Sequence, residues 1–248
     1  MKCQIILLSA TFSPAITAAY LPPFGISPAE LCEVRSCTDR QEIGFHVLQV
    51  LPTHAKGALQ HFVTKLQLKM ENSDRMLVFF ASNKEADDFG VVMSCAVFHS
   101  ELPTTGENSK ADNLDKWDSG KTKVMACTTA FAQGIDRSTV RFVVINGVEY
   151  GLPVINQMAG RAGRDGEEAH AFYLTSKTDF GAFPSDSDFD SLYALQSVVF
   201  GTTCRRYTSI SCMDGQSFAY RCKDKPHVMQ CDICGPTTHI HSFALDAI

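Results

Sequence analysis

Short runs of apolar residues, rich in β-branched and aromatic side chains, recur along the chain at wide spacing. They lie at Ile5–Leu8, Phe45–Leu51, Met76–Phe80, Val97–Phe98, Val124–Cys127, Phe142–Ile145 and Ala171–Leu174. Continuous apolar runs of this length are typical of strands that are buried on both faces of a parallel sheet. We therefore expect a strand at each run.

Stretches with helical periodicity separate several of these runs. Between Ala55 and Leu66 the apolar residues recur on one helical face, and Ser82 with Glu85 forms a capping box for a second helix that ends near Gly90. The stretch from Gly106 to Asp118 is polar and predicts a surface loop with a short helix. Strands alternating with helices predict an α/β fold with a doubly wound parallel sheet.

A change in composition marks a domain border. The acidic, serine-containing text between Asp179 and Asp190 precedes a cysteine-rich segment. We expect an α/β domain over residues 41–180, a small cysteine-rich subdomain over 190–236 and a tail over 237–248.

The net charge of the chain limits how it can bind nucleic acid. Its 22 Lys and Arg residues against 27 Asp and Glu residues give a net charge of −5, and 45% of its 248 residues are hydrophobic. This composition suits a globular protein, in which any contact with nucleic acid is local. The N-terminus resembles a secretory signal, but Gln4, Ser9 and Thr11 interrupt its apolar run, and no run approaches the ~18 apolar residues of a membrane span.

Half of the ten cysteines lie in the last 45 residues, which favours a metal site in a reducing compartment over a disulfide framework. A Cys-x-x-Cys pair with two more cysteines upstream is enough for a tetrahedral thiolate site, which suits Zn²⁺. Redox-active or unrelated thiols are the alternative, and a histidine could replace one ligand. The candidates are Cys204, Cys212, Cys222, Cys231 and Cys234, with His227, His239 and His241 as substitutes.

The decapeptide from Gln157 to Gly166 gathers one amide and two guanidinium groups. On a helix that begins near Pro153, Gln157, Arg161 and Arg164 would share one face. Two adjacent guanidinium groups repel each other unless an anion lies between them, and a polyphosphate fits that geometry. A pair of solvated surface arginines is the alternative.

Two further segments lie next to predicted strands, one after a strand and the other before a strand. Thr128, at a strand's carboxyl end, can donate its hydroxyl and backbone N–H to a phosphate, and Gly134 permits close approach of the backbone. An ordinary turn is the alternative. Gly120-Lys121-Thr122 looks like the end of a P-loop, but Asp115 stands where that motif needs glycine, so we expect a turn.

The decapeptide resembles motif VI of superfamily-two helicases in its RecQ form, Gln-x-x-Gly-Arg-Ala-Gly-Arg-Asp-Gly, where DEAD-box relatives usually carry His in place of Gln157. The resemblance implies a RecA-like domain in which Arg161 and Arg164 reach the γ-phosphate of ATP, with Arg164 as arginine finger. The segment Thr128 to Asp136 is similar to motif V, which implies that Gly134 and Asp136 lie at the nucleotide, although Ala132 and Gln133 depart from the usual Gly and Met.

Other segments follow the same family's order. Leu8 to Thr11 resembles motif III, so Ser9 and Thr11 would couple hydrolysis to strand movement, and residues 1–40 would be the remnant of a first lobe and a linker. Leu77 to Ser82 resembles motif IV, and Phe98 to Ser100 the next motif, which implies nucleic-acid contacts by Ser82, His99, Ser100 and Thr128. A histidine after a strand is, however, more often a packed or capping residue.

The tail is similar to the zinc-binding segment of RecQ-type helicases, in which Cys-Arg-Arg pairs with a late Cys-Asp-x-Cys, and to fungal RecQ-like forms in its Asp214-Gly215. This resemblance selects Cys204, Cys222, Cys231 and Cys234 as ligands and leaves Cys212 packed. Arg205, Arg206, Arg221, Lys223 and Lys225 give the tail local positive charge, for phosphate contact or as a solvated face.

The resemblance implies part of a nuclear, ATP-dependent 3′–5′ DNA helicase of DNA repair and recombination that acts on single strands and forks. A structural Zn²⁺ belongs to this chain, whereas ATP and Mg²⁺ need a first lobe whose P-loop the sequence lacks. We therefore expect no ATPase activity from the chain alone. A non-catalytic, zinc-stabilised nucleic-acid-binding module or a degenerate remnant is the alternative.

Overall fold

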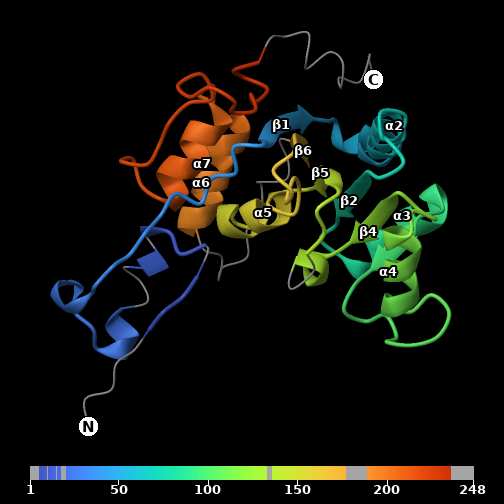
Figure 1. Ribbon diagram of the computed structural model, residues 1–248, viewed down its shortest axis with the longest axis horizontal. Helices are drawn as coiled ribbons and strands as arrows, with labels where there is room; N and C mark the ends of the chain where they lie inside the picture. Colours follow the sequence, from blue (N-terminus) through green and yellow to red (C-terminus); the bar gives the residue numbers. More distant parts are fainter. Residues whose placement is uncertain are drawn as a thin grey trace.

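A six-stranded parallel sheet in the order β1-β6-β5-β2-β4-β3 forms the centre of the fold (Figure 1). The computed structural model describes residues 6–9, 11–14, 16–17, 21–132, 136–176 and 189–235. The strands are β1 (Ile43–Gln49), β2 (Arg75–Phe79), β3 (Ala96–Phe98), β4 (Val124–Cys127), β5 (Val140–Asn146) and β6 (Ala169–Thr175). This confirms the predicted doubly wound parallel sheet.

The prediction of a strand at Ile5–Leu8 is wrong for its described part. Residues 6–9 have no regular secondary structure, and Leu8 is 90% exposed. A strand needs a neighbour to satisfy its backbone groups, and residues 6–9 pair with none of the six described strands.

The helices are α2 (Ala55–Gln67), α3 (Asn83–Met93), α4 (Lys110–Asp118), α5 (Leu152–Ala159), α6 (Phe189–Phe200) and α7 (Arg205–Met213), with short 3-10 turns η1 (Pro22–Phe24), η2 (Pro28–Glu30), η3 (Pro52–His54) and η4 (Thr129–Ala132). Three of the predicted helices, α2, α3 and α4, lie close to their predicted positions, whereas α5 ends earlier than expected. The Ser82 hydroxyl accepts the Glu85 N–H at 3.2 Å, which confirms the capping box of α3. Every helix among the described residues falls short of the length and apolarity that crossing a bilayer requires.

Alternate residues of each central strand supply two separate cores. Met76 and Val78 of β2 pack on the face covered by α2 and α3, whereas Leu77 and Phe79 pack on the opposite face. That opposite core also contains Trp117 of α4, residues of α5 and the buried side chains of α6 and α7. The C-terminal helices therefore share the sheet's core, and the greater part of the predicted border, 177–188, lies outside the described residues.

The segment that resembles the end of a P-loop is a turn, as predicted. Gly120 has φ +80°, and a Cβ atom there would lie 2.8 Å from the Arg75 guanidinium, so this turn requires glycine. Arg75 donates to the carbonyls of Trp117 at 2.6 Å and Asp118 at 2.9 Å, which holds the end of α4 against β2. The segment therefore closes a helix and does not cradle a phosphate.

Candidate functional site

The two arginines of the decapeptide lie beyond the end of α5, so the prediction that they share its helical face is wrong. Helix α5 begins after Gly151, with Pro153 in its first turn, and ends at Ala159. Gly163 has φ +60°, and a Cβ atom there would lie 2.9 Å from the Glu167 carbonyl oxygen, so the chain turns away here towards β6. We call residues 160–166 the arginine loop.

The arginine loop contacts the segment that follows β4. The Arg161 side chain is buried, and its Nη2 donates to the Ala132 carbonyl. Arg164 Nη1 donates to Asp136 Oδ1 at 2.7 Å. The two segments that resemble motifs V and VI are therefore joined by side-chain contacts, whereas Gly134 lies outside the described residues.

The charges of this group favour an additional anion. Burial lowers the pKa of Arg161, the neighbouring Arg164 lowers it further, and Asp136 only partly opposes them. The pKa of Asp136 is itself lowered, first because Arg164 donates a hydrogen bond to it and then by the charges of the surrounding arginines. An anion beside Arg161 would relieve this repulsion.

A cleft of about 690 Å³ brings together predicted residues from both ends of the sequence. Its lining includes Ser9 and Thr11 together with Gln157, Arg161 and Arg164. The Ser9 hydroxyl accepts the Thr11 N–H at 3.1 Å, and Gln157 is exposed at the end of α5. The segments that resemble motifs III and VI therefore line one space.

The residues predicted to contact nucleic acid lie at the carboxyl ends of β2, β3 and β4. Ser82 and Ser100 are exposed, whereas Thr128 is buried and its N–H already donates to the Phe98 carbonyl at 3.2 Å. That backbone N–H is therefore used inside the fold, contrary to the predicted phosphate contact. His99 is 4% exposed and bonds Asp87 through Nε2 at 3.1 Å, which matches the packed alternative.

Four cysteines of the tail form a compact group. The ligand atoms of Cys204, Cys222, Cys231 and Cys234 all lie within 4.8 Å of one another, with Sγ–Sγ distances of 3.5 Å from Cys204 to Cys222 and 3.9 Å from Cys204 to Cys231. Tetrahedral Zn–S bonds of about 2.3 Å require sulfur atoms about 3.8 Å apart. The group can thus bind a metal ion, and Cys212 is outside it.

The cysteines of this group shift one another's pKa in opposite directions. The pKa of Cys222 is raised by the neighbouring thiols and by burial, and the pKa of Cys234 is raised by burial and by the neighbouring thiols. The pKa of Cys204 is lowered because the Cys222 and Cys231 thiols donate hydrogen bonds to its sulfur, which outweighs burial. A thiolate is the form that ligates a metal ion.

Arg205 and Arg206 are buried, so the interpretation of these two residues as phosphate contacts or part of a solvated face is wrong. Arg205 pairs with Asp232 at 3.0 Å and donates to the carbonyls of α6 and Gly201. Arg206 has no exposed surface, pairs with Asp39 and donates to the Ile43 carbonyl at 2.6 Å. Both arginines act inside the fold, and each pairs with a carboxylate that is distant in sequence.

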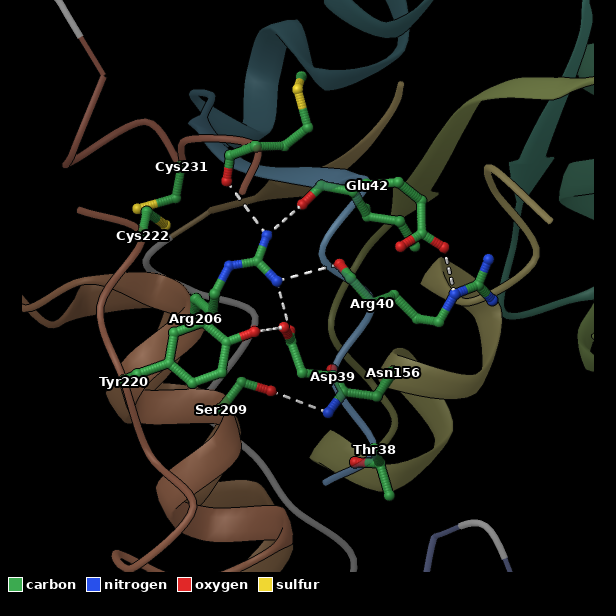
Figure 2. A network of polar contacts seen from close by, with 12 residues as sticks. Thr38, Asp39, Arg40, Glu42, Asn156, Arg206, Ser209, Tyr220, Cys222 and Cys231 are labelled. Carbon is green, nitrogen blue, oxygen red and sulfur yellow. Dashed lines mark hydrogen bonds and ion pairs between the residues drawn. The ribbon is translucent and has the colours of Figure 1, made fainter. Parts of the chain in front are cut away.

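Figure 2 shows the network around Arg206, which sequence reasoning missed. Asp39 accepts from Arg206 and from the Tyr220 hydroxyl, and the adjacent Arg40 extends towards the arginine loop. Asn156 of α5 donates to Ser209 of α7 at 2.9 Å, which joins these two helices nearby. The Cys-Arg-Arg sequence was the available signal for this network, but it does not reveal that Arg206 pairs with Asp39, which is 167 residues away.

Comparisons with known proteins agree with this arrangement. Residues 58–166 match the model of the helicase conserved C-terminal domain. The ATP-dependent DNA helicase hus2/rqh1 of Schizosaccharomyces pombe is 32% identical over 134 residues, which are 48% of this chain and 10% of that protein. The RecQ-like DNA helicase BLM of Xenopus laevis is 26% identical over 211 residues, 75% of this chain and 15% of that protein.

A solved structure, Saccharomyces cerevisiae Dbp5 bound to RNA and ADP BeF3, has the same fold with a TM-score of 0.55. It is 20% identical, and the match covers 78% of this chain and 48% of that chain. The parallel sheet with helices on both faces has the RecA-like fold, and residues 58–166 of it match the helicase conserved C-terminal domain. The relatives named above are DNA helicases of the RecQ type, so the chain is similar to the C-terminal region of such a helicase, and it spans about a tenth of the length of the first curated relatives that it matches.

The contact between Arg164 and Asp136 predicts a measurable titration. Replacing Arg164 with Gln removes the hydrogen bond and the nearest positive charge, so the pKa of Asp136 should rise towards the ordinary value of about 3.9. Because the pKa of Asp136 is lowered in the folded state, its ion pair with Arg164 stabilises the fold at neutral pH. This stabilisation is lost as the pH falls through the lowered pKa. Carboxyl NMR titration measures this change.

The Arg137→Gln variant is the matched control, because the charge of Arg137 is the smallest cause of the lowered pKa. It should raise the pKa of Asp136 less than Arg164→Gln does. An unchanged pKa in the Arg164 variant would show that the two side chains are not paired in solution.

Proposed function

We propose that this chain is the nucleotide-sensing and metal-binding half of an ATP-dependent RecQ-type DNA helicase core that translocates 3′ to 5′. The observation that carries the proposal is the cleft in which Arg161 and Arg164 lie together beside Asp136. Similarity to DNA helicases of the RecQ type supports it.

In this proposal the arginine loop acts on ATP that is bound across the cleft. Arg161 and Arg164 contact the γ-phosphate, and Arg164 stabilises the charge that develops as the terminal phosphoryl group is transferred to water. Arg164 leaves Asp136 to do so, and the ion pair that it breaks is open to solvent, because the Asp136 side chain is 77% exposed. Gln157 orients the phosphate or the attacking water.

Binding of ATP and Mg²⁺ requires residues that this sequence does not contain. The only P-loop-like sequence in the chain is the turn at Gly120. Ser9 and Thr11 line the same cleft as the arginines, and the sequence contains no phosphate-binding loop to accompany them. We therefore assign triphosphate and Mg²⁺ binding to a first RecA-like lobe. Gly134 and Asp136 then complete the nucleotide site from this side.

The proposed DNA track follows the carboxyl ends of β2, β3 and β4. The exposed hydroxyls of Ser82 and Ser100 would contact the phosphates of a single strand at a fork, where hydroxyl groups fix register without reading sequence. His99, bonded to Asp87 inside the fold, would support this edge. A nuclear role in DNA repair and recombination follows from the same family assignment.

We further propose that Cys204, Cys222, Cys231 and Cys234 bind one structural Zn²⁺. The Sγ–Sγ distances and the buried position of the group support zinc, which in a structural site takes four protein ligands and leaves no open coordination position. The metal would supply folding energy to a segment that has few strands or helices of its own.

The arginine finger is tested in the full-length parent helicase. Arg164→Ala should lower kcat for DNA-stimulated ATP hydrolysis by about 10³-fold, with a smaller change in KM, because the lost interaction forms mainly in the transition state. Steady-state ATP hydrolysis measures both constants.

Lys56→Ala, which removes an exposed cation from α2 on the other face of the sheet, is the control and should hydrolyse ATP normally. The proposal is contradicted if Arg164→Ala retains full kcat. It is also contradicted if the 248-residue chain alone hydrolyses ATP and loses that activity on the same substitution.

The metal is tested on the chain itself. The purified protein should contain one zinc per chain, and Cys231→Ser should lose it and unfold at a lower temperature. Metal analysis by mass spectrometry and thermal denaturation measure these properties. Cys212→Ser removes a cysteine outside the group and should retain the full zinc content; equal zinc loss in both variants would refute the assignment.

A further inference from the structure

The Arg40 side chain binds the backbone of the arginine loop. Its guanidinium donates to the carbonyls of Gly160 at 3.1 Å, Ala162 at 3.2 Å and Gly163 at 3.0 Å, and its Nε donates to Glu42 at 2.5 Å. Three acceptors within four consecutive residues flank Arg161 and precede Arg164. One side chain therefore fixes the backbone from which both arginines project.

The backbone of Arg40 is fixed in turn from the cysteine-rich subdomain. Arg206 donates to the Arg40 carbonyl at 3.0 Å and pairs with the Asp39 carboxylate, which also accepts the Tyr220 hydroxyl (Figure 2). Asp39 is 5% exposed and Arg206 has no exposed surface, so water does not compete for these contacts.

Arg206 is itself fixed by the metal-binding group. It lies two residues after Cys204, donates to the Met229 carbonyl at 3.1 Å and lies beside Cys222 and Cys231 (Figure 2). The sulfur atoms that close around a metal ion thus belong to the same segments that hold Arg206. Contacts run without a gap from the cysteines through Arg206, Asp39 and Arg40 to the arginine loop.

We propose that Arg40 is a positioning residue for Arg161 and Arg164, and that Asp39 and Arg206 link its position to the four-cysteine site. This inference rests on the proposed function of the arginine loop in sensing phosphate. A forked guanidinium suits the task, because it binds several carbonyls at once, which a lysine ammonium cannot do in the same plane. Loss of the metal would loosen the arginine loop even though no cysteine touches it.

The link is tested by hydrogen exchange of the backbone amides of residues 160–166 in the zinc-loaded chain. Arg40→Ala should speed this exchange by about tenfold, since several hydrogen bonds to a charged group are lost, while zinc content stays at one per chain. Arg40→Lys should restore part of the protection. Amides of β2 and β4 report whether the rest of the fold is intact.

Arg35→Ala is the matched control in the same segment. Arg35 donates to the Phe12 carbonyl at 2.6 Å and has no contact with the arginine loop among the described residues, so exchange over 160–166 should not change. Removal of zinc from the unmodified chain should speed exchange over 160–166, and the same removal should add little in Arg40→Ala.

Unchanged exchange in Arg40→Ala, or an equal further rise on zinc removal in both proteins, would overturn the proposal. If zinc removal also speeds amide exchange in β2 and β4, the Tyr220→Phe variant provides the test. This substitution removes one hydrogen bond to Asp39 and leaves all four cysteine ligands in place. Faster exchange over 160–166 with zinc retained supports the link, and unchanged exchange refutes it. None of these measurements involves ATP, so failure of the proposed helicase function would appear separately, as unaltered hydrolysis by Arg164→Ala in the parent.

Discussion

The ion pair between Arg206 and Asp39 is the interaction on which the arrangement of this region depends. A fully buried guanidinium is costly unless its donors are paired, and here Asp39 and the carbonyls of Arg40, Ile43 and Met229 accept from its two Nη atoms, while Nε has no hydrogen-bond acceptor among the described residues. These acceptors come from the linker, the start of β1 and the loop that precedes Cys231. Because one charge must be satisfied by all of them, the subdomain, linker and sheet have a single mutual position.

The sheet holds the proposed nucleic-acid contacts apart from the arginine loop. Exposed hydroxyls lie where β2 and β3 end, while Gly163 donates to the Val140 carbonyl at 2.9 Å and so ties the arginine loop to the start of β5. Helix α5, from whose end the arginine loop continues, packs on the core that α6 and α7 complete. A rigid layer thus connects the proposed nucleic-acid edge to the proposed nucleotide cleft, as coupling of hydrolysis to strand movement requires.

Local patterns in the sequence predicted the elements but not their long-range partners. The apolar runs located all six strands, and Ser82 with Glu85 located the start of α3, because burial and capping are encoded within a few residues. Helical spacing failed at Arg161 and Arg164, because Gly160 and Gly163 end the helix and redirect the chain. Charge pattern failed at Arg205 and Arg206, whose acidic partners are 27 and 167 residues away. The resemblance to RecQ-type helicases selected the four cysteines that the fold brings together, whereas nothing in the local text marked Asp39 or Arg40.

The central claim, that the buried pair fixes the subdomain on the sheet, is tested most directly by a double-mutant cycle on Arg206 and Asp39. Chemical denaturation of the zinc-loaded chain would compare Arg206→Met, Asp39→Leu and the double variant. Each single substitution leaves a buried charge unpaired and should lower the free energy of unfolding by about 3–5 kcal/mol, whereas the double variant should lose clearly less than the sum. Additive losses, or single losses within about 0.5 kcal/mol of zero as at ordinary surface positions, would contradict the claim.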